Sequence, residues 1–276
     1  MVGFENMSDP NIAARNILVI GTTGHVGRHV AAALPGARRM SRSGAAGFVR
    51  GDLTAPESLD ACLDGIDTVF LVWTAPREAF AAAWERIARR ARRVVFLSAP
   101  LKTPHPFFQQ PNPGRALAQQ IERTIESSGL EWTFLRPGMF AGNAVDFWSP
   151  QIRAGGTVRW PYLEVATAPI DEWDIAAVAV RALCEDGHGG AEYVITGPES
   201  LAQREQLEII GRAIGRALEL EELPPGEARL PRFLLDAWAA AAGRAAFVSP
   251  TFAELMGRQP RTFVQWAADH VREFQA

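Results

Sequence analysis

The chain of 276 residues contains few cysteines, lysines and tyrosines. Its 2 cysteines, Cys62 and Cys184, lie far apart, and neither has a cysteine or histidine neighbour at the spacing of a metal site. This scarcity argues against a disulfide framework and against a structural zinc site. We therefore expect two buried thiols, a reducing compartment and no bound metal.

Long apolar runs and a strong charge of either sign are also missing. No apolar segment approaches the roughly 20 residues that cross a bilayer, and residues 1–11 lack the apolar core of a signal peptide. The net charge of −3 gives no general attraction to nucleic acid or to an anionic membrane. We therefore predict a cytoplasmic protein whose partner is a small molecule, with no nucleic-acid or membrane partner. Monomer and dimer both stay open.

A glycine-rich motif near the N-terminus is the most informative feature that is present. It follows residues 17–20, an apolar run typical of a strand buried on both faces, and leads into a predicted helix at 28–34. There, G-x-x-G-x-x-G indicates a dinucleotide-binding turn, whose glycines allow a tight bend, approach of a pyrophosphate and close helix packing. A plain tight turn is the alternative. The predicted cofactor-binding residues are Gly21, Thr22, Thr23, Gly24, His25, Val26 and Gly27.

The end of the next predicted strand, residues 37–42, bears on the choice between NAD and NADP. An acid at this point would bond the 2′-hydroxyl of NAD, but the sequence reads Met-Ser-Arg-Ser. Arg42 can hold a 2′-phosphate through paired charge-assisted hydrogen bonds, with Ser41 and Ser43 donating beside it. A solvated surface arginine is the alternative. We predict NADP(H) as the cofactor, ahead of NAD.

Apolar segments alternate with helical segments over the first half of the chain. Further strands are predicted at 47–53, 67–73, 93–97 and 131–137, with helices at 56–63, 77–92 and 115–128. This rhythm predicts an α/β fold with a doubly wound parallel sheet, the Rossmann architecture. We expect an NAD(P)-binding core over 15–140 and a mixed segment over 141–276, which completes the sheet and forms a smaller lobe covering the substrate.

Less regular elements are predicted for the second half. Helices are expected at 144–154, 172–183, 200–218, 230–243 and 260–274, with strands at 157–163 and 192–195.

Polar or bend-forming residues stand where several predicted strands end, which is where such sheets bind their ligands. Asp52 can receive the adenine amino group, or it can cap the next helix. The remaining cofactor-binding residues predicted at strand ends are Leu53, Trp73, Thr74, Ser98, Pro137, Gly138 and Met139.

Taken together, these motifs resemble an atypical short-chain dehydrogenase/reductase, most similar to the NmrA-like NAD(P)H-binding subgroup common in actinobacteria. The resemblance rests on the glycine motif, on Gly-Asp-Leu at 51–53, on Ser98, on SGLEWTFLRPG at 128–138 and on Thr-Gly-Pro at 196–198. It covers roughly residues 16–220. It implies a Rossmann domain with a small C-terminal substrate lobe. Ketoreductases, quinone and ene reductases, ether reductases and cofactor-sensing regulators belong to this group.

The sequence departs from the family at the proton donor. The typical family reductase uses a tyrosine assisted by a lysine four residues on, but here the tyrosines are Tyr162 and Tyr193 and the lysine is Lys102. Some atypical relatives keep a lysine at a position that corresponds to Ala118. The resemblance places Ser98 at the family's catalytic serine. The usual acid is therefore absent, which favours either an unusual reductase or a cofactor sensor.

Hydride transfer to a carbonyl requires a group that stabilises the developing oxyanion. The catalytic candidates are Ser98, Lys102 and His105. Histidine is a common general acid or base, which makes His105 a candidate, although a histidine between two prolines is more often surface. A substrate hydroxyl beside the ketone could replace the missing acid through an internal hydrogen bond.

Aromatic residues follow the fifth and sixth predicted strands, and the family resemblance places them around the entrance for the substrate. Ligand pockets are mostly apolar with a few polar groups, so a flat aromatic substrate is expected, although a role in the core is the alternative. We predict an NADPH-dependent ketoreductase for a polycyclic aromatic, antibiotic-type polyketide, with a redox sensor or a quinone or ene reductase as alternatives. The predicted substrate-binding residues are Phe107, Phe108, Phe140, Asn143, Phe147, Trp148, Trp160 and Tyr162.

Overall fold

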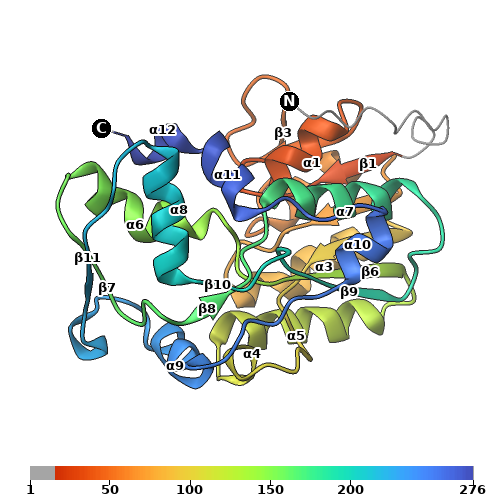
Figure 1. The fold of residues 1–276 in the computed structure, drawn as a ribbon. Helices are drawn as coiled ribbons and strands as arrows, with labels where there is room; N and C mark the ends of the chain where they lie inside the picture. The colour runs from red at the N-terminus through yellow and green to blue at the C-terminus, as the bar shows by residue number, and fades with distance from the viewer. Residues whose placement is uncertain (1–15, 276) are drawn as a thin grey trace. The chain divides into compact units, whose positions relative to one another are not determined.

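A seven-stranded sheet forms the centre of the fold in the computed structural model, which describes residues 16–275 (Figure 1). The strand order is β3-β2-β1-β4-β5-β6-β9, and the recorded pairs from β3 through β6 are all parallel. The doubly wound parallel sheet predicted from the sequence is confirmed. The strands are β1 (Ile17–Val19), β2 (Arg38–Ser41), β3 (Val49–Arg50), β4 (Thr68–Leu71), β5 (Arg93–Leu97), β6 (Glu131–Pro137) and β9 (Ala191–Ile195).

Helices cover both faces of this sheet, as the alternating pattern predicts. Figure 1 shows α1 and α7 on one face and α3 and α5 on the other. The chain order reverses between β1 and β4, which creates the switch point where such sheets bind ligands. The helical elements are α1 (Gly27–Ala33), η2 (Pro56–Ser58), α2 (Leu59–Leu63), η3 (Arg77–Ala79), α3 (Phe80–Ala88), α5 (Pro113–Glu126) and α7 (Glu172–Cys184).

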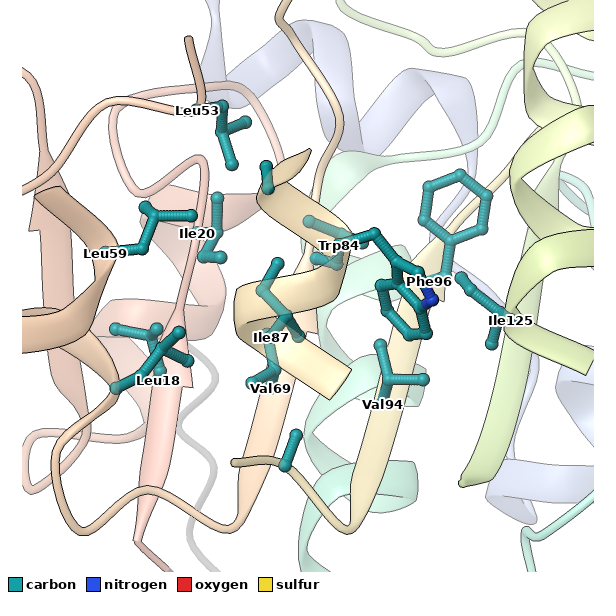
Figure 2. Close-up of a cluster of buried hydrophobic side chains, with 14 of the residues drawn as sticks. Leu18, Ile20, Leu53, Leu59, Val69, Trp84, Ile87, Val94, Phe96 and Ile125 are labelled. Carbon is teal, nitrogen blue, oxygen red and sulfur yellow. The ribbon is translucent and has the colours of Figure 1, made fainter. Parts of the chain in front are cut away.

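The apolar strands are buried on both faces, which explains why they read as continuous apolar runs. Figure 2 shows Leu18, Val69 and Val94 from adjacent strands beneath Trp84 and Ile87 of α3. The residues that alternate with them along the strands are buried as well. Because each strand packs on two layers of helices, the sheet positions the loops at its carboxyl edge rigidly.

Two compact units share the chain. The first comprises the described residues up to Ala99 together with Ala116–Arg136 and Ile175–Tyr193, and the second comprises Pro100–Arg115, Pro137–Asp174 and the residues from Val194 on. The sequence placed one boundary near residue 140, whereas these units interleave along the chain. We call them the first and the second unit.

Short strands and helices make up the second unit, around a core rich in tryptophan. Strands β10 and β8 pair antiparallel, and β11 and β7 pair parallel. Its elements are α4 (Pro106–Gln109), α6 (Asn143–Arg153), β7 (Val158–Trp160), β8 (Ala166–Thr167), β10 (Leu201–Ala202), α8 (Gln203–Ala213), β11 (Leu220–Glu222), η4 (Pro225–Glu227), α9 (Arg232–Ala241), α10 (Thr251–Met256), α11 (Phe263–Asp269) and α12 (Val271–Phe274).

Several predicted elements are shorter than expected. The helix expected over 200–218 ends at Ala213, because Gly215 takes a left-handed φ of 70°. The helix expected over 260–274 is two helices, and α11 begins at a capping box between Thr262 and Gln265. Two short helices were not predicted: α4, which lies between the predicted strand at 93–97 and the predicted helix at 115–128, and α10.

The described residues bear on two predictions from the sequence, those on membrane spans and on disulfides. Between residues 16 and 275, no helix combines the length and the apolar character that crossing a bilayer requires. Cys62 and Cys184 are both buried thiols without a disulfide, as the sequence predicts. The signal-peptide prediction for residues 1–11 lies outside the described residues.

Candidate active site

A groove of about 300 Å³ opens at the carboxyl edge of the sheet, within the first unit. The loops that follow β1, β2, β3 and β4 form its walls, so it lies at the switch point between β1 and β4. Among the residues predicted to bind the cofactor, nine line the groove. They are Gly21, Thr22, Thr23, Gly24, Ser41, Arg42, Asp52, Leu53 and Thr74.

The glycine turn has the geometry that a pyrophosphate requires. Gly21 takes a φ of 87°, and a Cβ added there would lie 2.7 Å from the Val72 Cβ, so a side chain is excluded at this bend. A Cβ on Gly27 would overlap the Gly21 carbonyl oxygen. Gly24 is exposed at the groove and donates its N–H to Gly21 O at 3.0 Å. Thr22 Oγ1 donates to Met40 O at 2.7 Å and so ties the turn to β2. This bare backbone surface fits a dinucleotide.

Polar side chains surround the outer end of the groove. Arg42 is exposed, and Ser41 Oγ accepts from Gly44 N at 3.1 Å and lies 3.4 Å from Ser43 Oγ. Asp52 Oδ1 accepts from Thr54 N at 2.9 Å and from Thr54 Oγ1 at 2.8 Å. These hydrogen bonds, helped by the charge of Arg42, lower the pKa of Asp52. Asp52 therefore closes a local turn with Thr54 and does not cap the next helix, whose N-cap residue is Ala55. Its other oxygen can still meet an adenine.

Six other predicted cofactor residues in the first unit do not line the groove, and Ser98, which is one of them, is described below. Val26 and Gly27 are buried beneath the turn, and His25 and Ser43 are exposed beside it. Trp73 packs edge-on against Phe80 at 5.0 Å and joins the hydrophobic core. Because side chains alternate along an extended chain, its neighbours Val72 and Thr74 reach the groove instead.

Ser98 comes directly after β5, at the same edge of the sheet. Its backbone N–H donates to Leu135 O at 2.8 Å, and its Oγ donates to Glu122 Oε1 at 2.6 Å. Glu122 lies on the buried face of α5 and is only 4% exposed. The hydroxyl of this serine is therefore held by a buried carboxylate.

An arginine neutralises that carboxylate. Arg136 of β6 is 1% exposed, and its Nε and Nη2 donate to the two oxygens of Glu122 at 2.9 and 2.6 Å. Its Nη1 donates to Glu192 of β9. Burial alone would lower the pKa of Arg136, but the hydrogen bonds and charges of the two glutamates outweigh burial and raise it. The network is therefore a charged cluster inside the core.

Sequence reasoning did not assign a role to Glu122, Arg136 or Glu192. Two signals could have found the main pair. Arg136 interrupts an otherwise apolar strand, and Glu122 shares the buried stripe of α5 with Ala118, Ile121 and Ile125. Opposite charges at core positions indicate a buried pair, because an unpaired charge is very costly there.

The second unit contains the two other catalytic candidates, Lys102 and His105. Lys102 is exposed and has a left-handed φ of 60°. His105 is buried, so the surface alternative for it is wrong. Its Nδ1 accepts from Phe107 N at 3.3 Å, which leaves the proton on Nε2, 3.0 Å from the accepting Ala245 O. His105 therefore caps α4, and both of its nitrogens are engaged.

A narrow cavity in the second unit collects several of the predicted ligand residues. Phe107, Phe108, Gly138 and Met139 line it together with His105, and its volume is about 10 Å³. Pro137 is buried next to it in the chain, and Gly138 N donates to Ile195 O at 2.8 Å.

The remaining aromatic candidates divide between small cavities and the core. Phe140 and Asn143 line a second cavity of about 10 Å³, with Phe147 and Trp148. Phe147 and Trp160 also border a groove of about 460 Å³.

Tryptophan packing favours the core alternative for two of these residues. Trp148 and Trp160 are 2% and 5% exposed, their rings meet edge-on at 5.9 Å, and Trp160 Nε1 donates to Gln203 Oε1 at 2.8 Å. Tyr162 lies beside the core with its ring 6.4 Å from that of Trp238. Most of the surface of Trp148 and Trp160 thus contributes to packing.

Comparison with known protein families gives a direct identification of the ligand class. A family model described as NAD(P)H-binding matches residues 21–186, which include the glycine turn, Ser98, Glu122 and Arg136. NAD(P)H is therefore the cofactor. The match agrees with the fit between the glycine turn and a dinucleotide.

Curated relatives and solved structures add to this result. The chain is 37% identical to a (4-alkanoyl-5-oxo-2,5-dihydrofuran-3-yl)methyl phosphate reductase of Streptomyces griseus, over 94% of this chain and 99% of the relative. It is 31% identical to an NAD(P)H azoreductase of Xenophilus azovorans, over 94% and 99%.

Two solved structures share the fold. An NADPH-dependent quinone oxidoreductase of Escherichia coli has a TM-score of 0.74 at 18% identity, over 92% of this chain and 98% of that one. A Citrobacter triphenylmethane reductase complexed with NADP(H) has a TM-score of 0.74 at 17% identity, over 93% and 99%.

Proposed function

We propose a reaction for this chain from one premise: it belongs to the NAD(P)H-binding family, among the NmrA-like atypical short-chain dehydrogenases/reductases, and is an NAD(P)H-dependent oxidoreductase. It reduces a small molecule whose acceptor is conjugated to a carbonyl group, such as an activated alkene or a quinone. NADPH is the preferred cofactor. The observation that carries the proposal is a groove suited to a dinucleotide in a chain where Ser98, His105 and Tyr193 are already engaged in hydrogen bonds.

The groove residues divide the work of holding the cofactor. The backbone N–H groups of Gly21 to Gly24 would donate to the pyrophosphate, and Arg42 with Ser41 would hold the 2′-phosphate. Thr74 and Ser98 follow β4 and β5, where they would border the nicotinamide. When bound, the reduced nicotinamide supplies a hydride to the substrate.

Neither Tyr162 nor Tyr193 is followed by a lysine four residues on, so the usual tyrosine–lysine acid of a carbonyl reductase is absent. The hydroxyl of Tyr193 lies 2.7 Å from Nδ1 of His188, with which it shares a hydrogen bond. His105 is engaged through both nitrogens, and the hydroxyl proton of Ser98 is directed to Glu122. An acceptor that spreads the incoming charge over a conjugated carbonyl can be protonated by water, so it suits such a site.

The named relatives support this substrate class. A 5-oxo-2,5-dihydrofuran ring contains a C=C bond conjugated to a carbonyl, and an azo group is likewise a conjugated acceptor. The phenolic polycyclic ketone expected from the sequence is a second candidate. The aromatic edges of Phe107 and Phe108 beside Met139 favour it.

An assay of NADPH consumption tests the proposal. The acceptors are 2(5H)-furanone, menadione, the azo dye methyl red and a polycyclic ketone with and without a neighbouring hydroxyl. We expect turnover of the furanone or the quinone, faster with NADPH than with NADH. If NADPH binds but none of these acceptors is reduced, the chain is a cofactor sensor rather than a reductase.

A further inference from the structure

We propose that Glu122 is a positioning residue that fixes the Ser98 hydroxyl as a hydrogen-bond acceptor for an N–H or O–H donor. The donor belongs to the bound cofactor or to the substrate. The inference extends the proposed function. Of the two experiments below, only the one that measures turnover rests on the proposed function. Ser98 is then neither the proton donor of the reaction nor a donor to an oxyanion.

The argument begins with the single proton of the serine hydroxyl. A hydroxyl offers one donor and two lone pairs, whereas a carboxylate paired with an arginine can only accept. At 2.6 Å from Glu122 Oε1, the Ser98 hydroxyl must therefore direct its proton to Glu122. Its lone pairs are the groups that remain for a ligand.

The surroundings prevent this arrangement from reversing. Arg136 holds both oxygens of Glu122 in a paired geometry, and Glu192 holds the third guanidinium nitrogen. Breaking such a buried pair leaves an uncompensated charge, so the carboxylate stays in place. The backbone of Ser98 is fixed as well, through its N–H bond to Leu135 O.

The position of Ser98 indicates which donors can reach it. Strands β4 and β5 run parallel with Leu71 opposite Phe96, so Ser98 and the groove residue Thr74 lie at the same edge of the sheet. A nicotinamide carboxamide N–H is one donor that belongs at this edge, and a substrate hydroxyl is another. Both have the same chemistry, and two experimental arms distinguish them.

The first arm measures binding by calorimetry. NADPH is compared with 2′,5′-ADP, which lacks the nicotinamide, for the wild type, Ser98→Ala and Glu122→Gln. The glutamine has one acceptor oxygen where the carboxylate has two, and Arg136 competes for it with charged donors, so Ser98 loses its partner. If the donor is the carboxamide, NADPH affinity falls about 3- to 10-fold in both variants, and 2′,5′-ADP affinity stays unchanged.

The second arm measures kcat/KM with whichever acceptor the wild type reduces. If the donor is the substrate, both variants lose about 3- to 10-fold in kcat/KM while NADPH affinity is unchanged. In either arm, Ser98→Ala/Glu122→Gln is no worse than Ser98→Ala alone, because both changes remove the same interaction. Ser98→Thr, which keeps the hydroxyl, restores most of the loss.

A matched control separates positioning from stability. Glu192→Gln removes a charge from the same arginine without touching Ser98, so it lowers stability but changes neither NADPH affinity nor kcat/KM. If Glu122→Gln does not fold, the double variant Glu122→Met/Arg136→Met is used instead of it, because that variant removes the whole buried pair.

Three outcomes overturn the inference. In the first, the losses in affinity or kcat/KM caused by Ser98→Ala and Glu122→Gln add up in the double variant. In the second, Glu122→Gln and Glu192→Gln change affinity or kcat/KM equally. In the third, Ser98→Ala and Glu122→Gln leave NADPH affinity unchanged, and turnover is unchanged or absent. A protein without turnover whose NADPH affinity follows the expected pattern would refute the proposed function and support the positioning role.

Discussion

The cofactor groove of the first unit and the aromatic core of the second unit are built in different ways. The groove is formed by backbone turns and short polar side chains at strand ends, with Gly21 in a left-handed conformation that fixes the bend. The aromatic core is formed by large rings: the centroid of the Trp160 ring lies 5.9 Å from that of Trp148 and 5.8 Å from that of Trp238.

This difference has a consequence for mutations. In the groove, a small change should remove cofactor binding and leave folding largely intact, because the altered atoms face the ligand. In the aromatic core, a change should lower stability and leave the groove intact, because the altered atoms pack against other rings.

The largest effect is expected for Gly24→Val. Gly24 is exposed at the groove, so a branched side chain would occupy the place of the pyrophosphate while the fold survives. We expect NADPH binding to disappear in calorimetry, with a small fall in the thermal midpoint, because a Cβ at Gly24 would lie 3.3 Å from Gly21 O. Gly27→Ala is the contrasting control, since its Cβ would overlap the Gly21 carbonyl oxygen and should lower stability. Unchanged NADPH affinity in folded Gly24→Val would place the cofactor elsewhere.

Trp148→Ala tests the other side of the comparison. The ring is buried against Phe147 and Trp160, so its loss should cost about 3–5 kcal/mol in the free energy of unfolding. Urea denaturation measures the loss, and Trp148→Phe should lose less. NADPH affinity of the folded protein should stay within about twofold of the wild type, since about 0.4 kcal/mol is near the resolution of such comparisons. A large fall in affinity would break the distinction between the two regions.

Arg42→Ala sharpens the description of the groove. Arg42 is exposed beside Ser41, where it would pair with a 2′-phosphate, so its loss should weaken NADPH binding by about 1–3 kcal/mol. NADH affinity should hardly change, because NADH lacks that phosphate. Equal affinity of the unmodified protein for NADPH and NADH would contradict the cofactor assignment.

The smallest effect concerns pH and His188, which lies in the first unit outside the groove. Burial lowers the pKa of His188 below its ordinary value of 6.5. The charge of Glu185 opposes this shift, and the charges of Arg181 and Arg93 add to it. The unfolded chain therefore binds this proton more readily. The stabilising contribution is complete above about pH 6.5 and is lost as the pH falls through the folded pKa.

Urea denaturation between pH 5 and 8 measures this contribution as a difference from His188→Gln. The difference should grow in favour of the wild type as the pH rises to about 6.5, with a slope below about 1.4 kcal/mol per pH unit. NADPH affinity of the two proteins should remain equal. A pH-independent difference would show that His188 has the same pKa in the folded and unfolded chain.

The same comparison explains which parts of the fold and of the site could be predicted from the sequence. Strands such as residues 93–97 and 131–137 were predicted with the bounds that the structure has, because buried parallel strands read as apolar runs. The glycine turn was predicted because its function depends on backbone freedom, which only glycine provides. The substrate residues are harder, since an aromatic residue looks the same in sequence whether it packs in a core or faces a ligand.

The Ser98 network shows a different limit. The serine could be found from the family motif, but its hydrogen bond to Glu122 depends on how α5 packs against the sheet. The break at residue 270 and helix α10 were missed because short helices depend on tertiary contacts more than on local propensity.

The central claim is that this reductase transfers hydride without a tyrosine acid. The most direct test incubates the double variant Tyr162→Phe/Tyr193→Phe with 2(5H)-furanone and NADPH deuterated at C4, and locates the label by NMR. We predict that the variant keeps most of the wild-type kcat and that deuterium appears on the β-carbon of the saturated lactone. A variant that binds NADPH as the wild type does but no longer transfers deuterium would contradict the claim.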